Sequence, residues 1–231
     1  ITEGKLRSMK THGVTRISIN PQSMKEHTLE LLGRKHTVEE IREKFMLART
    51  LGFDNINMDL IAGLPEETLE DFKETLREVE ALKPDSITVH TLVIKRASRL
   101  RKEQLEQGGE MREEDACIEP MQKEAEQFCR VHGYEPYYMY RQKNKAHTTR
   151  NTNQENVAYA KPGKECLYNM LIMEELETIV ALGSGASTKI VYPGENRMER
   201  VENVKNVDEY INRIDEMIER KRSGFRELLQ K

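Results

Sequence analysis

The stretch NMDLIAGLPEET, residues 57–68, decides the fold of this chain. Its first half completes an apolar run, NINMDLI (55–61), that predicts a buried strand. Gly63 and Pro65 are turn residues, and a helix is predicted to begin near Thr68. One carboxylate, Asp59, interrupts the apolar run. Because a buried charge has to be paired or hydrogen-bonded, this acid either has a protein partner or binds a ligand.

Neighbouring segments repeat the order of strand and helix. A β-branched run, 16–20, precedes two predicted helices, one with a capping box of Ser23 and Glu26 and one with a box of Thr37 and Glu40. Another apolar run, 86–94, precedes a predicted helix around 112–132. This alternation is typical of βα units on a parallel sheet, and the continuous apolar strands indicate burial on both faces.

The pattern changes after Gly133. Four further strands are predicted, separated by polar turns, and a loop is expected over 147–156. These strands cover 134–142, 165–173, 178–182 and 188–192, and a last helix covers about 206–222. We therefore expect two regions, an α/β region at 1–110 and a C-terminal region at 111–231 with antiparallel strands and a terminal helix.

Composition narrows the class of protein. With 37 basic and 40 acidic residues and a net charge of -3, the chain has no electrostatic footprint for nucleic acid. No run approaches the roughly 18 apolar residues of a membrane span. Three widely spaced cysteines, Cys117, Cys129 and Cys166, fit a reducing compartment, so we expect a cytoplasmic protein. Since the chain opens without Met in what looks like mid-domain sequence, we expect a fragment.

Ligands of parallel α/β sheets bind where the strands end, and this rule selects candidate residues. Gln22 follows the first strand, Asp59 lies toward the end of the second, and His90 to Val93 occupy the distal half of the third. If the strands are parallel neighbours, these groups converge on one rim. Asp59 would accept hydrogen bonds from a ligand there, or it would be satisfied by a neighbouring arginine or by loop amides.

For two polar residues near this rim, Gln22 and Arg34, a purely structural role is an alternative to ligand binding. Gln22 could fix a polar ligand or cap the following helix, and Gly63 and Pro65 are expected to shape the turn after the strand. Arg34 could pair with a ligand carboxylate or serve as an ordinary cation at a helix end.

Other chemistry is only weakly indicated. The six histidines show no close ligand spacing, and the cysteines match no compact cluster motif, so no metal ligands are predicted. LGSGAST (182–188) is a tight turn or an approach for an anionic ligand. Four tyrosines could form a wall for a flat ligand, although strand aromatics more often belong to the core. These are Tyr134, Tyr137, Tyr138 and Tyr140.

Several strings taken together resemble a known family. They are GVTRISINPQS, LGRKHTVEE, ARTLGFDNINMDLIAGLPEETLEDF and KPDSITVHTL, with YMYRQKN, YAKPGKECLYN and LGSGAST further on. In this order they resemble the C-terminal part of radical-SAM oxygen-independent coproporphyrinogen III oxidases (coproporphyrinogen dehydrogenases), in the oxidase-like branch. The resemblance implies an α/β fold, the C-terminal half of a partial (β/α)6 radical-SAM barrel followed by a small, mainly antiparallel α+β appendix.

The resemblance also implies cofactors and site residues. Gln22, Arg34 and Asp59 stand where the family has polar contacts to S-adenosyl-L-methionine (SAM), and Val93 stands where the backbone approaches the adenine. The family holds a [4Fe-4S] cluster on CxxxCxxC, and neither this motif nor the Gly-rich SAM stretch occurs in the chain. We therefore expect the cluster ligands to lie in the full-length protein and this piece to be inactive alone.

The implied reaction is oxidative decarboxylation of the propionates of coproporphyrinogen III to vinyl groups, with a radical generated from SAM. The alternative is a related radical-SAM protein that binds and transfers haem without decarboxylation. Either way the expected partner is a tetrapyrrole. We also expect self-association through the exposed sheet edge of the fragment.

Overall fold

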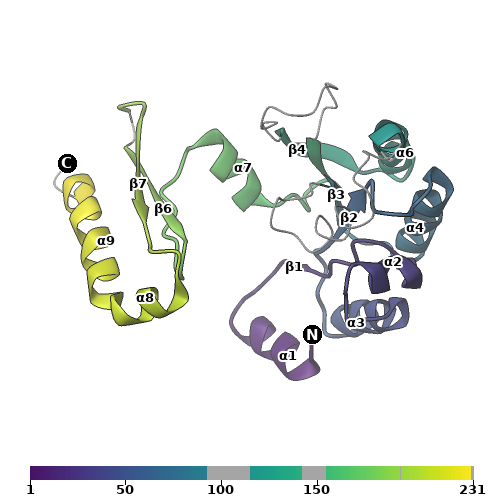
Figure 1. Cartoon of the computed structure of the whole chain (residues 1–231), viewed down its shortest axis with the longest axis horizontal. Coiled ribbons are helices and arrows are strands. Elements are labelled where there is room, and N and C mark those ends of the chain that lie inside the picture. Colours follow the sequence, from purple (N-terminus) through teal and green to yellow (C-terminus); the bar gives the residue numbers. More distant parts are fainter. Residues whose placement is uncertain (93–114, 142–154, 193, 230–231) are drawn as a thin grey trace, which may run out of the picture. The chain divides into compact units, whose positions relative to one another are not determined.

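The computed structural model describes residues 1–92, 115–141, 155–192 and 194–229 (Figure 1). They divide into two compact units, Ile1–Glu165 and Cys166–Lys231. The side chains of the candidate residue Val93 and of Cys117 are not among those that the structure describes.

The first unit is built on one sheet of five strands in the order β1-β2-β3-β5-β4 (Figure 1). β1, β2 and β3 pair in parallel, β5 pairs antiparallel with β3, and β4 pairs antiparallel with β5. The strands are β1 (Ile17–Ser18), β2 (Ile56–Ala62), β3 (Ser86–Thr91), β4 (Glu135–Arg141) and β5 (Glu155–Ala160). The helices are α1 (Glu3–Thr11), α2 (Glu26–Leu31), α3 (Val38–Thr50), α4 (Leu69–Leu82) and α6 (Asp115–Val131).

The two faces of this sheet differ in chemistry. Met58, Leu60 and Ala62 on β2 are fully buried in the hydrophobic core, together with residues of α3, α4 and α6. Because successive side chains of a strand point to opposite faces, Asn57 and Asp59 belong to the other face. The expected burial on both faces is confirmed, since Asn57, Ser86 and Thr88 are also buried, but the second face carries polar groups.

Helix starts follow local capping chemistry in two of the three expected places. Thr37 and Glu40 form a capping box at α3, and Thr68 forms one with Asp71 at α4. The expected box of Ser23 and Glu26 is wrong. α2 begins at Glu26 with Lys25 as its N-cap residue and no side-chain cap, because the Ser23 oxygen accepts from Lys25 N–H at 3.2 Å and the Glu26 carboxylate accepts from Val38 N–H at 2.8 Å.

The sheet also takes in strands from beyond the expected boundary at residue 110. β4 confirms the strand predicted at 134–142, and it joins the sheet of the first unit through β5. β5 begins inside the expected loop 147–156, of which residues 147–154 lie outside the described part. Because β5 begins with the polar residues Glu155 and Asn156, the sequence pattern did not predict a strand there.

The second unit is a two-stranded hairpin with helices: α7 (Leu167–Glu174), β6 (Ser187–Tyr192), β7 (Arg197–Glu202), α8 (Val207–Asn212) and α9 (Ile214–Leu229). The strand predicted at 165–173 is wrong, since this run forms α7, and a short apolar run does not by itself distinguish helix from strand. The strand predicted at 178–182 reduces to one bridge between Ile179 and Lys189. The predicted last helix is split into α8 and α9.

α9 packs closely on the hairpin. A Cβ on Gly224 would lie 2.8 Å from Ile190 Cδ1 and 2.9 Å from Val201 Cγ2. The helix therefore needs glycine at this position to reach the sheet. Among the described helices, none is long and apolar enough to cross a membrane.

Candidate functional site

A row of polar side chains crosses the second face of the five-stranded sheet. Parallel pairing sets Asn57 beside Ser86 and Asp59 beside Thr88, and His90 follows two residues further along β3. With the alternation of strand side chains, these residues share one face. We call Asn57, Asp59, Ser86, Thr88 and His90 the polar row.

Asp59 is the charged centre of the polar row. Its Oδ1 accepts a hydrogen bond of 2.7 Å from Asn57 Nδ2, and its Oδ2 lies 3.5 Å from His90 Nε2. The Asp59 side chain retains 21% of its exposure. It lies in the middle of β2, not toward the end as expected, and its partners are a histidine and an amide rather than the arginine or loop amides considered above.

The Asp59 carboxylate stays ionised in this environment. Burial works to raise its pKa, but the hydrogen bond and charge of His90 and the hydrogen bonds of Asn57 and Thr88 outweigh burial. The net result is a pKa below the ordinary value for aspartate. At neutral pH the polar row therefore presents a fixed, partly exposed negative charge.

Asn57 orients the row. Its Oδ1 accepts hydrogen bonds from Ser86 Oγ at 3.0 Å and from Thr88 Oγ1 at 3.1 Å, which fixes the amide so that Nδ2 points to Asp59. Arg16 completes the network at the start of the strands, where its Nη1 donates to Ser86 Oγ at 2.9 Å and to Lys164 O at 3.1 Å. The polar row is thus a connected network rather than a set of isolated groups.

Gln22 lies next to Asp59 through the backbone. The Gln22 N–H donates to Asp59 O at 3.0 Å, and Ile61 N–H donates to Gln22 O at 3.0 Å. Gln22 adopts φ 71, a left-handed conformation that is uncommon for a residue with a side chain. The structure therefore brings two of the predicted site residues together and holds one of them in an unusual conformation.

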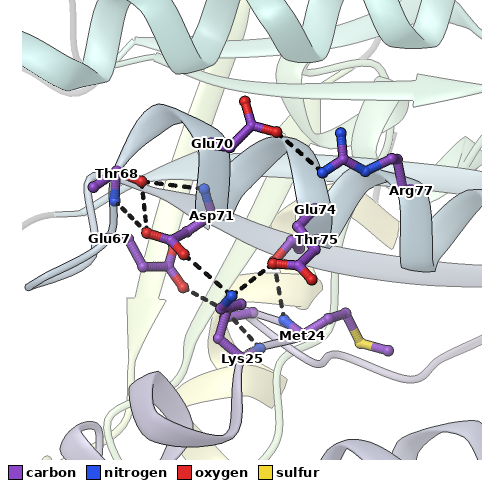
Figure 2. Close-up of polar contacts among 10 residues, drawn as sticks. Met24, Lys25, Glu67, Thr68, Glu70, Asp71, Glu74, Thr75 and Arg77 are labelled. Carbon is purple, nitrogen blue, oxygen red and sulfur yellow. Dashed lines mark hydrogen bonds and ion pairs between the residues drawn. The ribbon is translucent and has the colours of Figure 1, made fainter.

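The connection that carries Gln22 is fixed to the start of α4 by a polar cluster (Figure 2). The Ser23 hydroxyl donates to the buried Glu67 carboxylate, and Met24 N–H donates to Thr75 Oγ1 at 3.2 Å. Lys25 Nζ lies between two carboxylates, 3.1 Å from Asp71 and 2.6 Å from Glu74 (Figure 2). We call these residues the Glu67 cluster.

Glu67 is the unusual member of this cluster. Only 8% of the residue is exposed, and burial raises its pKa even though hydrogen bonds from Ser23 and Thr28 oppose the shift.

The turn that leads to Glu67 contains Gly63 at φ 83, where a Cβ would lie 2.6 Å from Ile118 Cγ1. The expectation that Gly63 shapes the turn after β2 is confirmed.

Arg34 is not joined to the polar row by any described contact. It follows α2 and Gly33, its backbone N–H donates to Leu29 O at 2.9 Å, and its side chain is exposed. No hydrogen bond or ion pair among the described residues holds its guanidinium group.

Of the remaining candidates, Tyr134, the GSG turn and Cys129 have structural roles, whereas Tyr140 is exposed. Tyr134 is buried, and its hydroxyl donates to Pro84 O at 2.7 Å. In the GSG turn, Gly185 N–H donates to Val204 O at 2.7 Å and Gly183 N–H to Tyr210 Oη at 3.2 Å, which favours the tight-turn interpretation. Burial raises the pKa of the Cys129 thiol to about 12, so this thiol stays protonated.

Sequence reasoning missed three members of the polar row, Asn57, Ser86 and Thr88. The signal was a polar residue at every second position of two adjacent strands, NxD in one and SxTxH in the other. Strand alternation turns this spacing into a single polar face. His90 alone among the histidines was placed at the rim, and it lies in the row.

The chain resembles known proteins in sequence and fold. Residues 1–79 match the Radical SAM superfamily. The chain is 42% identical over its whole length to the oxygen-independent coproporphyrinogen-III oxidase-like protein HemZ of Bacillus subtilis, and it covers 44% of that protein. It is 29% identical over 78% of its length to the heme chaperone HemW of Escherichia coli, covering 42% of it.

The fold is shared with a solved structure described as coproporphyrinogen III oxidase (HemN) from Escherichia coli, a radical-SAM enzyme. The TM-score is 0.67 at 20% identity, over 94% of this chain and 46% of that one. Residues 1–79 therefore match a radical-SAM domain in sequence, and the chain shares the fold of a solved radical-SAM enzyme. More narrowly, its homologues include coproporphyrinogen III oxidases and oxidase-like proteins, as the sequence resemblance predicted, and it spans less than half of their length.

Proposed function

We propose that the polar row forms one wall of a SAM site. Asp59 supplies the anionic contact, Gln22 and Arg34 supply further polar contacts, and the backbone at Val93 approaches the adenine. The observation that carries this proposal is Asp59, an ionised and partly exposed carboxylate held in the middle of a parallel strand.

The chemistry of these side chains fits SAM. The ligand carries ribose hydroxyls and an ammonium group, which donate hydrogen bonds to an anionic carboxylate. It also carries a carboxylate, which an exposed guanidinium can pair with in bidentate geometry. Asp59 and Arg34 supply these two complementary charges. The backbone of Gln22 pairs with Asp59 and Ile61 of the same strand, which supports including Gln22 in this site.

The described residues do not fit the iron–sulfur cluster. Among them, no group of three or more His, Cys, Asp or Glu side chains could hold a metal ion. SAM and a [4Fe-4S] cluster supply the radical chemistry in this superfamily. The residues of this chain bind the ligand, orient it and limit its access to water.

For the intact protein we propose oxidative decarboxylation of coproporphyrinogen III propionates to vinyl groups, a step of haem biosynthesis. The similarity to the HemZ oxidase-like protein over the whole chain supports this choice. A second candidate is haem binding and transfer without decarboxylation. Similarity to the heme chaperone HemW over 78% of the chain supports this alternative.

The experiment that separates the two uses the intact protein, reconstituted anaerobically with iron and sulfide. It is incubated with SAM and coproporphyrinogen III, and in parallel with haem. We expect vinyl-containing product and consumption of SAM. Stoichiometric haem binding without any vinyl product would contradict the oxidase and favour the haem carrier.

A further inference from the structure

His90 is a titratable group of the polar row that the proposed contacts leave unused. Its Nε2 lies 3.5 Å from Asp59 Oδ2, and 35% of its side chain is exposed. It comes from β3, whereas Asp59 comes from β2, so the pair joins two adjacent parallel strands.

The two oxygens of Asp59 have different partners. Asn57 Nδ2 donates to Oδ1 at 2.7 Å, and Asn57 is itself fixed by Ser86 and Thr88. His90 faces Oδ2. A donor on each oxygen restricts rotation of the carboxylate about its Cβ–Cγ bond, because any rotation lengthens at least one hydrogen bond.

We propose that His90 is a positioning residue for the SAM site. By donating its Nε2–H to Oδ2, it holds the Asp59 carboxylate in the orientation that accepts the adenosyl ligand. This inference rests on the proposed function of Asp59. The present separation of 3.5 Å is long for a hydrogen bond, and such contacts commonly shorten when a ligand completes the site.

The chain offers a matched control. His132 Nε2 lies 3.4 Å from Glu80 Oε1, and its side chain is 31% exposed, so this histidine repeats the carboxylate contact and the exposure of His90 away from the polar row, although Glu80 is more exposed than Asp59, 50% against 21%. A loss of binding caused by removal of any half-exposed histidine would appear at both sites. A positioning role is specific to His90.

The first measurement is the affinity of the intact protein for S-adenosylhomocysteine by titration calorimetry. We expect His90→Ala to weaken binding about 10-fold or more, as expected for loss of one hydrogen bond to a charged group. His90→Gln keeps a nitrogen donor near the position of Nε2 and should restore affinity to within about 3-fold of wild type. His132→Ala should leave it unchanged.

The second measurement needs no ligand. In a long-range ¹H–¹⁵N spectrum of the histidine rings, Asp59→Asn should shift the Nε2 resonance of His90 and leave that of His132 in place. A His90 ring that carries its only proton on Nδ1 would overturn the inference, because Nε2 would then have no hydrogen to donate.

The outcomes distinguish this inference from the proposed function. If the wild-type protein does not bind S-adenosylhomocysteine, the proposed SAM site is wrong, and the proposed role of His90 is wrong as well. If it binds and His90→Ala binds equally well, the SAM site stands and only the role of His90 is wrong.

Discussion

The Ser23 hydroxyl donates a hydrogen bond to the Glu67 carboxylate, joining the connection after β1 to the connection after β2. Ser23 is adjacent to Gln22, whose left-handed backbone pairs with β2. The Glu67 cluster therefore fixes the segment next to Gln22, which is a strained residue of the candidate site. Strain of this kind persists only where the surrounding structure fixes it.

Glu67→Gln should be at least as stable as the wild type at pH 7.5. The folded-state pKa of Glu67 is raised, so its stabilising contribution is full below the unfolded pKa and is lost as pH rises through the folded pKa. Glutamine keeps an oxygen that accepts the Ser23 hydrogen bond without a charge to bury. Urea unfolding at pH 5 and 7.5 measures this, and an advantage that shrinks as pH rises would contradict it.

Asp59→Asn should weaken binding of S-adenosylhomocysteine by about 10-fold or more, because a charged acceptor is replaced by a neutral group. The pKa of Asp59 is lowered, so the wild-type carboxylate remains anionic down to its folded pKa, below the ordinary aspartate range. Affinity measured from pH 8 down to pH 5 should therefore show no loss through protonation of Asp59. Equal affinity of the variant and the wild type would refute the anionic contact.

Gly63→Ala should destabilise the first unit by about 2 kcal/mol or more, since the new methyl group meets Ile118 and φ is positive. Gly163→Ala is the matched control. Gly163 also has a positive φ, 77, but nothing lies within 4 Å of its added Cβ. Thermal unfolding should give the control only the conformational cost of a side chain at positive φ, about 1–2 kcal/mol. Similar losses in both variants would mean that the Ile118 contact has no effect.

Gly224→Ala should destabilise the second unit although alanine favours a helix. Its methyl group would meet Ile190 and Val201 on the hairpin. Gly4→Ala in α1, where nothing lies within 4 Å, should instead stabilise its helix by about 0.5–1 kcal/mol. Opposite signs in calorimetry are the expected result, and a stabilised Gly224→Ala would show that α9 does not pack as described.

The 231-residue chain should associate with itself as its concentration rises. β1 ends the described sheet on one side and pairs only with β2 there. Unpaired strand edges add further strands readily. Light scattering over a range of concentrations checks this, and a monodisperse monomer throughout would argue against it.

The sequence predicted the parts of the fold whose signals are local. The strands around Asp59 and His90 follow from apolar runs, and the box at Thr37 follows from side-chain spacing. The box at Ser23 failed because α2 begins only at Glu26, and because the Glu26 carboxylate accepts from Val38 N–H, 12 positions further along the chain. The run at 165–173 failed because an apolar stretch of that length suits a helix as well as a strand.

The sequence predicted which positions belong to the candidate site, but it did not predict the hydrogen bonds that connect them. Strand order placed Gln22 and Asp59 near each other, whereas the hydrogen bonds of Asn57 depend on the register of β2 against β3. Register is a property of the folded sheet, so the partners of Asp59 could not be read from one strand alone.

The hydrogen bond from Arg16 to Lys164 O joins residues 148 positions apart. β3 likewise gains its antiparallel neighbour only from residues 157–160. During synthesis, the first three strands therefore leave the ribosome well before the segment that covers their edge. Such long-range pairing slows folding and leaves strand edges exposed to other chains. We expect this unit to complete its sheet late, and to depend on chaperones until β5 has been made.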